Sequence, residues 1–182
     1  MNHPAEPLEA YRAMTKDELV GLFRIGVERF DKRVFELGNE QLDRVWMPEA
    51  GAGRWAIRVL LGHLADAEVI NTHRLRKTFA EDGPVIEAWG PDEYIDSGLY
   101  GVGARDGEAV FQPIGAFVAT IHTLRAWTGE WLEGLPPSAW DQKAMHTVRG
   151  AFTFRELVGL STWHLENHAW FLNQKVAKLG EG

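Results

Sequence analysis

Four stretches of the chain repeat apolar residues at the three- and four-residue spacing of an amphipathic α-helix. They cover about residues 15–37, 55–80, 113–133 and 154–178. Because this spacing places one apolar stripe on each helix, it predicts elements that bury a face against one another. No stretch shows sustained alternation of apolar and polar residues, so no strand is predicted. The expected fold class is all-α, a four-helix bundle.

Local signals mark where these helices begin and end. Thr15, followed three residues later by Glu18, has the pattern of a capping box, and Thr153 is a candidate N-cap for the last helix. Residues 1–14 precede the first helix and are expected to form an N-terminal tail. Residues 15–180 then make a single bundle domain, because 182 residues suffice for one full hydrophobic core.

A long connection separates the second and third helices. Residues 81–107 are too many for a tight turn and contain Trp89, Tyr94 and Tyr100. Such a segment is a candidate crossover or lid. A crossover of this length would allow the two middle helices to run parallel.

Composition argues against several classes of function. The formal charge is -7 and no basic stripe appears, so nucleic-acid binding is not expected. The chain has no cysteine, which excludes disulfides, thiolate metal ligands and a protein thiol nucleophile. No secretory signal pattern and no apolar run of bilayer length are present, so we expect a cytoplasmic protein without a membrane partner.

Three histidines on apolar stripes are the candidate chemistry. His164 and His168 stand four residues apart, which places them on one helix face about 6 Å apart along the axis. His63 lies on the inward stripe of the second helix, between Leu60 and Ala67. A buried imidazole without a partner costs free energy. Three of them in one small core favour a shared metal ion with open coordination positions.

The residues beside these histidines exclude two common classes of metal site. A zincin carries glutamate directly after its first histidine, whereas Leu165 follows His164. Di-iron carboxylate bundles carry a glutamate three residues before a histidine. The residues at that position before the three histidines are Leu60, Ser161 and Leu165.

Other polar residues are weaker candidates. Asp66, one turn from His63, and Asn71, two turns from it, could orient a ligand or contact a substrate, although surface solvation explains them equally well. His146, in the loop before the last helix, could reach the mouth of the bundle. The remaining histidines fit a tail or surface role better; they are His3, His73 and His122.

The chain resembles the DinB-like superfamily, and within it the YfiT-like metal-dependent hydrolases. The resemblance covers nearly the whole chain after the first fifteen or so residues. It rests on the run from Trp55 to Glu68 with its His-x-Ala-Asp segment, on residues 74–77, on the loop 140–150 and on Trp163-His164-x-x-x-His168. One departure is visible, because close YfiT-like sequences have a further histidine where this chain has Glu68.

The resemblance implies an up-down-down-up four-helix bundle, frequent homodimers and a divalent ion, commonly zinc or nickel. Carried over to this chain, the ligands are His63, His164 and His168. Members with assigned activities include transferases and isomerases in which the metal activates the thiolate of a small cosubstrate.

Three hypotheses follow from these observations. The first is a divalent-metal-dependent enzyme with a small-molecule substrate, either a hydrolase or a transferase that uses a low-molecular-weight thiol. The second is a non-catalytic metal-binding protein, for instance in a stress response. The third is a structural bundle whose histidines are satisfied by neighbouring residues.

Overall fold

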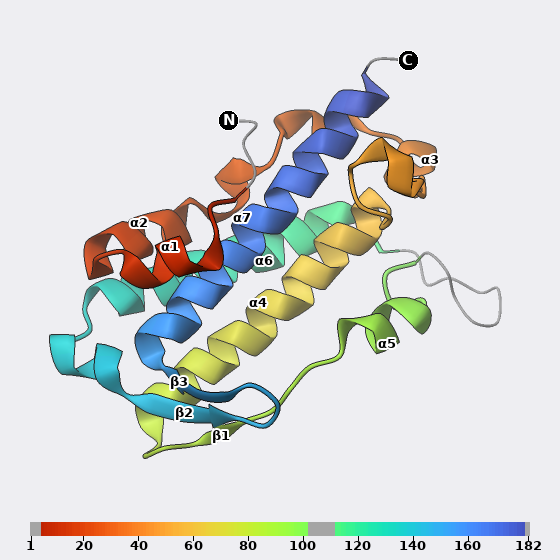
Figure 1. The fold of residues 1–182 in the computed structure, drawn as a ribbon. Helices are drawn as coiled ribbons and strands as arrows, with labels where there is room; N and C mark the ends of the chain where they lie inside the picture. The colour runs from red at the N-terminus through yellow and green to blue at the C-terminus, as the bar shows by residue number, and fades with distance from the viewer. Residues whose placement is uncertain (1–4, 102–111, 181–182) are drawn as a thin grey trace.

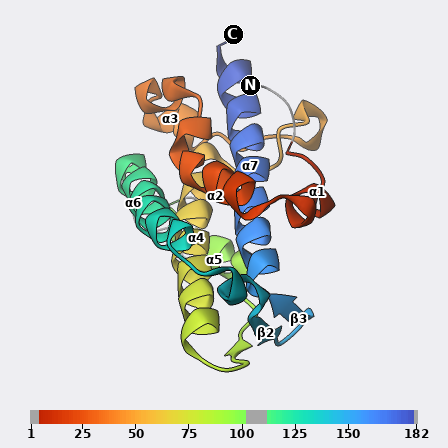
Figure 2. The ribbon, with the colours of Figure 1, turned by 90° about the vertical axis from the view of Figure 1, so that its left-hand side faces the viewer.

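Three long helices form the frame of the fold, in a computed structural model that describes residues 5–101 and 112–180. They are α4 (Ile57–Ala80), α6 (Ile114–Glu133) and α7 (Phe154–Leu179). α4 packs against both α6 and α7, and the shorter α2 (Lys16–Ile25) packs against α6 and α7. Figures 1 and 2 show α4 and α6 running in the same direction and α7 running opposite to both. The prediction of a helical bundle is confirmed.

The ends of the long helices follow the local signals. Thr153 Oγ1 accepts a hydrogen bond from the Glu156 N–H at 3.2 Å, and the Glu156 carboxylate accepts the Thr153 N–H at 2.8 Å. Thr15 and Glu18 make the same reciprocal pair at the start of α2, at 3.3 and 2.8 Å. Both predicted N-caps are therefore confirmed, because each satisfies backbone donors that the first turn leaves free.

The first predicted helix is wrong beyond residue 25. α2 ends at Ile25 and two 3₁₀ turns follow, η1 (Gly26–Arg29) and η2 (Lys32–Glu36). Gly26 has φ +50°, and a Cβ placed on it would lie 3.2 Å from Arg125 Cδ. A helix cannot continue through this conformation, and the close approach of Arg125 favours glycine here.

The described part of the N-terminal segment, residues 5–14, packs on the bundle. It contains α1 (Leu8–Ala13), which lies against α7. Tyr11 is buried, and its hydroxyl donates to Glu166 Oε2 at 3.3 Å. The segment expected to be a tail thus contributes to the core, while His3 lies outside the described residues. The other short helices are α3 (Asn39–Leu42), η3 (Pro48–Ala50), α5 (Pro91–Asp96) and η4 (Pro137–Asp141).

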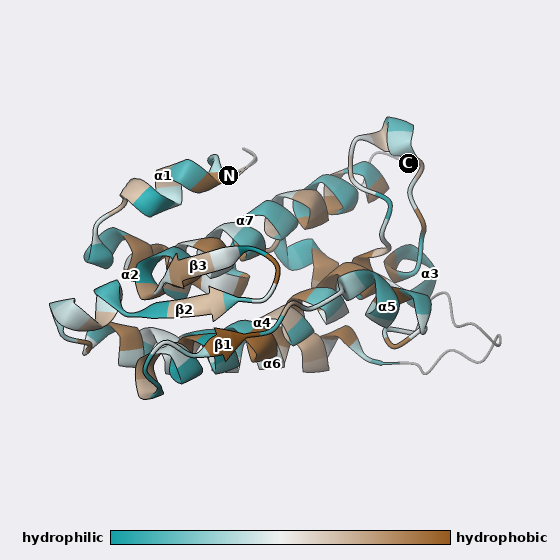
Figure 3. Ribbon diagram, turned by 60° about the horizontal axis from the view of Figure 1, so that its bottom comes forward, coloured by the Kyte–Doolittle hydropathy of each residue, from teal (hydrophilic) through white to brown (hydrophobic). Residues whose placement is uncertain are grey.

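A small sheet covers the end of the bundle where α4 ends and α7 begins (Figures 1 and 3). β1 (Val85–Ile86) pairs in parallel with β2 (Lys143–His146), and β2 pairs antiparallel with β3 (Gly150–Thr153). The prediction of no strands is wrong. These strands are two to four residues long, which is too short for an alternating pattern to show in the sequence. The sheet attaches the crossover to the loop before α7.

The described part of the crossover lies along α4. Tyr100 packs on Gly62, where an added Cβ would lie 2.3 Å from the ring, and its hydroxyl donates to Asp66 at 2.7 Å. Residues 102–107 of the predicted crossover lie outside the described residues. Gly62 therefore provides the space in which the crossover meets the helix.

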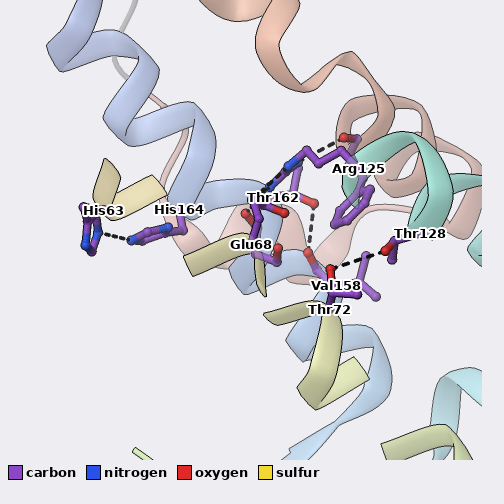
Figure 4. Close-up of polar contacts among 10 residues, drawn as sticks. His63, Glu68, Thr72, Arg125, Thr128, Val158, Thr162 and His164 are labelled. Carbon is purple, nitrogen blue, oxygen red and sulfur yellow. Dashed lines mark hydrogen bonds and ion pairs between the residues drawn. The ribbon is translucent and has the colours of Figure 1, made fainter. Parts of the chain in front are cut away.

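A buried ion pair joins the four helices (Figure 4). Arg125 of α6 donates to Glu68 Oε1 of α4 at 2.8 and 3.0 Å. It also donates to the carbonyl of Phe23 in α2 at 3.0 Å and to that of Ser161 in α7 at 2.7 Å. One side chain thus sets the positions of α2, α4 and α7 around α6.

Apolar residues on both sides of this pair form the core. One cluster gathers around Leu61, Leu64 and Leu165, and the other around Phe23, Trp140 and Phe154. Although this interior is extensive, no helix in the described ranges is long and apolar enough to cross a membrane.

Candidate metal centre

Three imidazoles from two helices meet in the middle of the bundle. His63 projects from α4, and His164 and His168 project from successive turns of α7. One ring nitrogen from each lies within 4.8 Å of the other two. His63 Nε2 and His164 Nε2 are 3.1 Å apart, the contact drawn in Figure 4. The structure therefore brings together the three histidines that the sequence pattern singles out.

The burial of these rings leaves polar atoms without partners. In the described part of the chain, Nδ1 of His63, His164 and His168 is buried and makes no hydrogen bond. Nor is there a carboxylate in this group of facing ligand atoms. A buried nitrogen without a partner is costly, because it loses its hydration. The donor set fits a divalent ion of the zinc, nickel, copper or iron type.

Electrostatics keeps the three rings neutral, which is the form that binds a metal. Burial lowers the pKa of His63 to about 4. Burial, followed by the charges of His63 and Lys175, lowers the pKa of His168 to about 3. The pKa of His164 is lowered well below its ordinary value, by burial first and then by the other two histidines. Protons would therefore not compete for these nitrogens near neutral pH.

Two tryptophans cover the imidazoles, and sequence reasoning did not assign them to the site. The ring of Trp89 stacks on His63 with centroids 5.1 Å apart and an interplanar angle of 11°. The ring of Trp55 stacks on His168 at 5.7 Å and 17°. The sequence signals were their places in the chain: Trp89 lies in the predicted crossover, and Trp55 begins the run that carries the family resemblance. These rings shield the cluster from water and orient the imidazole planes.

Two cavities reach the cluster. One has a volume of about 320 Å³ and is lined by His63 and His164 together with Asn71 and His146. Two of the weaker sequence candidates thus face the same space as the histidine cluster. The second cavity has a volume of about 260 Å³ and is lined by Trp55, Leu60, His168, Phe171 and Lys175, among others.

His146 is held in one tautomer. Its Nδ1 accepts the backbone N–H groups of Val148 at 3.1 Å and Arg149 at 3.2 Å. Its pKa is lowered by burial first and then by the charges of Arg74 and Arg149. A neutral imidazole whose Nδ1 is an acceptor carries its proton on Nε2. His146 therefore offers an N–H donor.

Neither the candidate Asp66 nor Glu68 lines the cavity. Asp66 accepts the hydroxyl of Tyr100 and does not line the 320 Å³ space. Glu68, where the resemblance leads us to expect a histidine, is fully buried against Arg125 and does not belong to the histidine cluster. His73 and His122 are exposed, in keeping with the surface role expected for them.

Lys175, near the end of α7, is buried. It is 1 % exposed, and its Nζ donates to the carbonyls of Ala52 and Gly53. Burial lowers its pKa to about 8. This side chain thus fastens the loop before α4 to α7.

Comparison with known families agrees with this geometry. The family model of the DinB superfamily matches residues 22–172, which include all three histidines. The chain belongs to the DinB superfamily. Two curated proteins of Oceanobacillus iheyensis, both named "putative metal-dependent hydrolase", are similar to this DinB chain. One is 26 % identical over 74 % of this chain and 70 % of its own length, and the other is 21 % identical over 77 % and 73 %.

A solved structure shares the fold. YfiT from Bacillus subtilis, described as "a probable metal-dependent hydrolase with an unusual four-helix bundle topology", superposes with a TM-score of 0.77. The match covers 97 % of this chain and 94 % of YfiT at 17 % identity. At that identity the likeness establishes the four-helix fold of this DinB member.

Proposed function

We propose that this protein is a divalent-metal-dependent enzyme that acts on a small molecule, with His63, His164 and His168 as the metal ligands. The observation that carries the proposal is the meeting of three neutral imidazoles, two of which, His63 and His164, line a cavity of about 320 Å³. A storage or structural site closes its coordination sphere with protein ligands. A three-ligand set beside a cavity favours chemistry over the non-catalytic, stress-response alternative.

Hydrolysis is the reaction that we propose first, in keeping with the names of the curated relatives. A divalent ion held by three imidazoles supplies Lewis acidity, which lowers the pKa of water in an open position to about 7. His146 would donate its Nε2 proton in a hydrogen bond to the substrate oxygen that gains negative charge. Asn71 would hold the substrate through its carboxamide, and Trp89 would limit the entry of bulk water.

A thiol-dependent transfer is the second candidate, and the lining of the cavity favours it. No carboxylate lines the described cavity, so no carboxylate there could serve as a general base. A small thiol, which this cysteine-free chain cannot supply itself, would need only to lose its proton to solvent. Its sulfur would then form a bond to the electrophilic carbon while the leaving group departs with the bonding electron pair.

We further propose zinc or nickel as the native ion, a homodimer as the assembly and the cytoplasm as the location. Neutral imidazole nitrogens suit both ions. The formal charge of -7 argues against nucleic acid as a partner.

Metal analysis of protein made in its own host tests the proposal. We expect about one divalent ion per chain in the wild type and almost none in His164→Ala. His122→Ala, which changes an exposed histidine outside the cluster, should retain the ion. Hydrolase substrates and electrophiles are then screened with and without a small thiol, before and after chelation. The proposal would be overturned if the turnover rate were the same before and after chelation, or if the wild type and His164→Ala had equal metal content.

A further inference from the structure

Two arginines line the same cavity as the histidine cluster. Arg74 comes from α4, one turn beyond Asn71, and Arg149 comes from the turn between β2 and β3. The described lining contains no aspartate or glutamate. The cavity therefore carries concentrated positive charge in a chain whose formal charge is -7.

Neither guanidinium has a carboxylate partner within the described chain. Arg74 Nη2 donates to the backbone carbonyl of Glu87, which orients the side chain without neutralising it. Arg149 is exposed at the mouth of the cavity. The pKa of Arg74 is lowered by burial first and then by the positive charge of Arg149. The two guanidinium groups therefore repel one another. An anion between them would relieve this repulsion.

We infer that this cavity binds an anionic group, a carboxylate or a phosphate, with Arg74 and Arg149 as its cationic partners. The inference rests on the proposed function, because the anionic group would belong to the substrate or the thiol cosubstrate of the metal site. Guanidinium groups donate paired, charge-assisted hydrogen bonds to such anions.

The remaining lining residues fit the rest of such a molecule. Trp89 and Trp163 provide aromatic surface and Leu160 adds an aliphatic wall, so a flat apolar body can lie beside the charged end. Asn71 and the fixed N–H of His146 add neutral hydrogen-bonding groups. The expected ligand is a small amphipathic acid that reaches from the arginines towards His63 and His164.

A matched pair of probes, benzoate and its neutral analogue benzamide, tests the inference by ligand-observed NMR titration at low salt. We expect the wild type to bind benzoate about tenfold more tightly, the effect of one charge-assisted contact. The titration is made on the protein as purified and again after chelation. The preference should persist without metal, so failure of the metal proposal and failure of this inference are distinguishable.

Arg149→Gln should abolish the preference for benzoate, and Arg149→Lys should keep part of it. Arg54→Gln is the matched control, because Arg54 is also exposed but lines the second cavity, beside His168. A second pair, 3-mercaptopropionate and 2-mercaptoethanol, tells whether the anion belongs to the thiol. A carboxylate preference in the thiol pair alone assigns it to the cosubstrate. Equal binding within both pairs, or a preference that Arg54→Gln removes and Arg149→Gln keeps, overturns the inference.

Discussion

Replacing Arg125 by methionine should destabilise the whole bundle. Arg125 is 1 % exposed and Glu68 is 0 % exposed, and the guanidinium donates four hydrogen bonds, two of them to Glu68 and one each to Phe23 and Ser161. Arg125→Met leaves a buried carboxylate unpaired and takes one donor from each of two carbonyls. Breaking such a pair costs about 3–5 kcal/mol. A domain of this size has a total stability of about 5–15 kcal/mol.

The double variant Glu68→Leu/Arg125→Met separates the charge from the packing. Because it removes both buried charges, we expect it to recover most of the loss and to lie within about 1 kcal/mol of the wild type. The assay is urea unfolding of chelator-treated protein followed by circular dichroism. At about 2–4 °C per kcal/mol for this chain length, the single variant should also melt about 6–20 °C lower. The reasoning is refuted if Arg125→Met has the same urea midpoint as the wild type, or if the double variant is no more stable than the single variant.

Three further outcomes are expected. Zinc at a hundred times its Kd should stabilise the protein by about 2.7 kcal/mol in thermal melts, whereas His164→Ala should show no shift. Gly62→Ala should cost about 1–3 kcal/mol in urea unfolding, because its Cβ would meet the Tyr100 ring at 2.3 Å, while Gly115→Ala, with open space around it, should not destabilise. Because burial lowers the pKa of His63 to about 4, stability of the metal-free protein should be fully present above pH 6.5 and be lost as the pH falls towards 4. A urea midpoint that stays constant between pH 7 and pH 5 would contradict the last of these.

The long helices could be predicted from the sequence to within about two residues. α4, α6 and α7 have twenty or more residues each, so their apolar stripes repeat over several turns. The break at Gly26 could not be predicted. It depends on Arg125, which approaches from a residue 99 positions later. The strands were missed because pairing between Ile86 and His146 is a tertiary contact with too few residues to leave a pattern.

In the candidate site, too, some residues could be predicted from the sequence and others could not. The three histidines could be found because each lies on an apolar stripe, where an imidazole has no solvent to satisfy it. The stacking of Trp89 on His63 could not, because the crossover that carries Trp89 has no periodicity that fixes its path. Asp66 was a reasonable candidate because it lies one helical turn from His63, but its carboxylate accepts a hydrogen bond from the hydroxyl of Tyr100.

The separation of the histidines along the chain has a consequence for how the protein would lose its structure. His63 and His164 are 101 residues apart in sequence, so an ion shared between them would close a loop of more than half the chain. In the chain-entropy model, a cross-link over about 100 residues removes unfolded-state entropy worth about 4.7 kcal/mol. Such an ion would act as a reversible cross-link between α4 and α7. Metal supply would then govern how long the folded protein survives as well as whether it reacts.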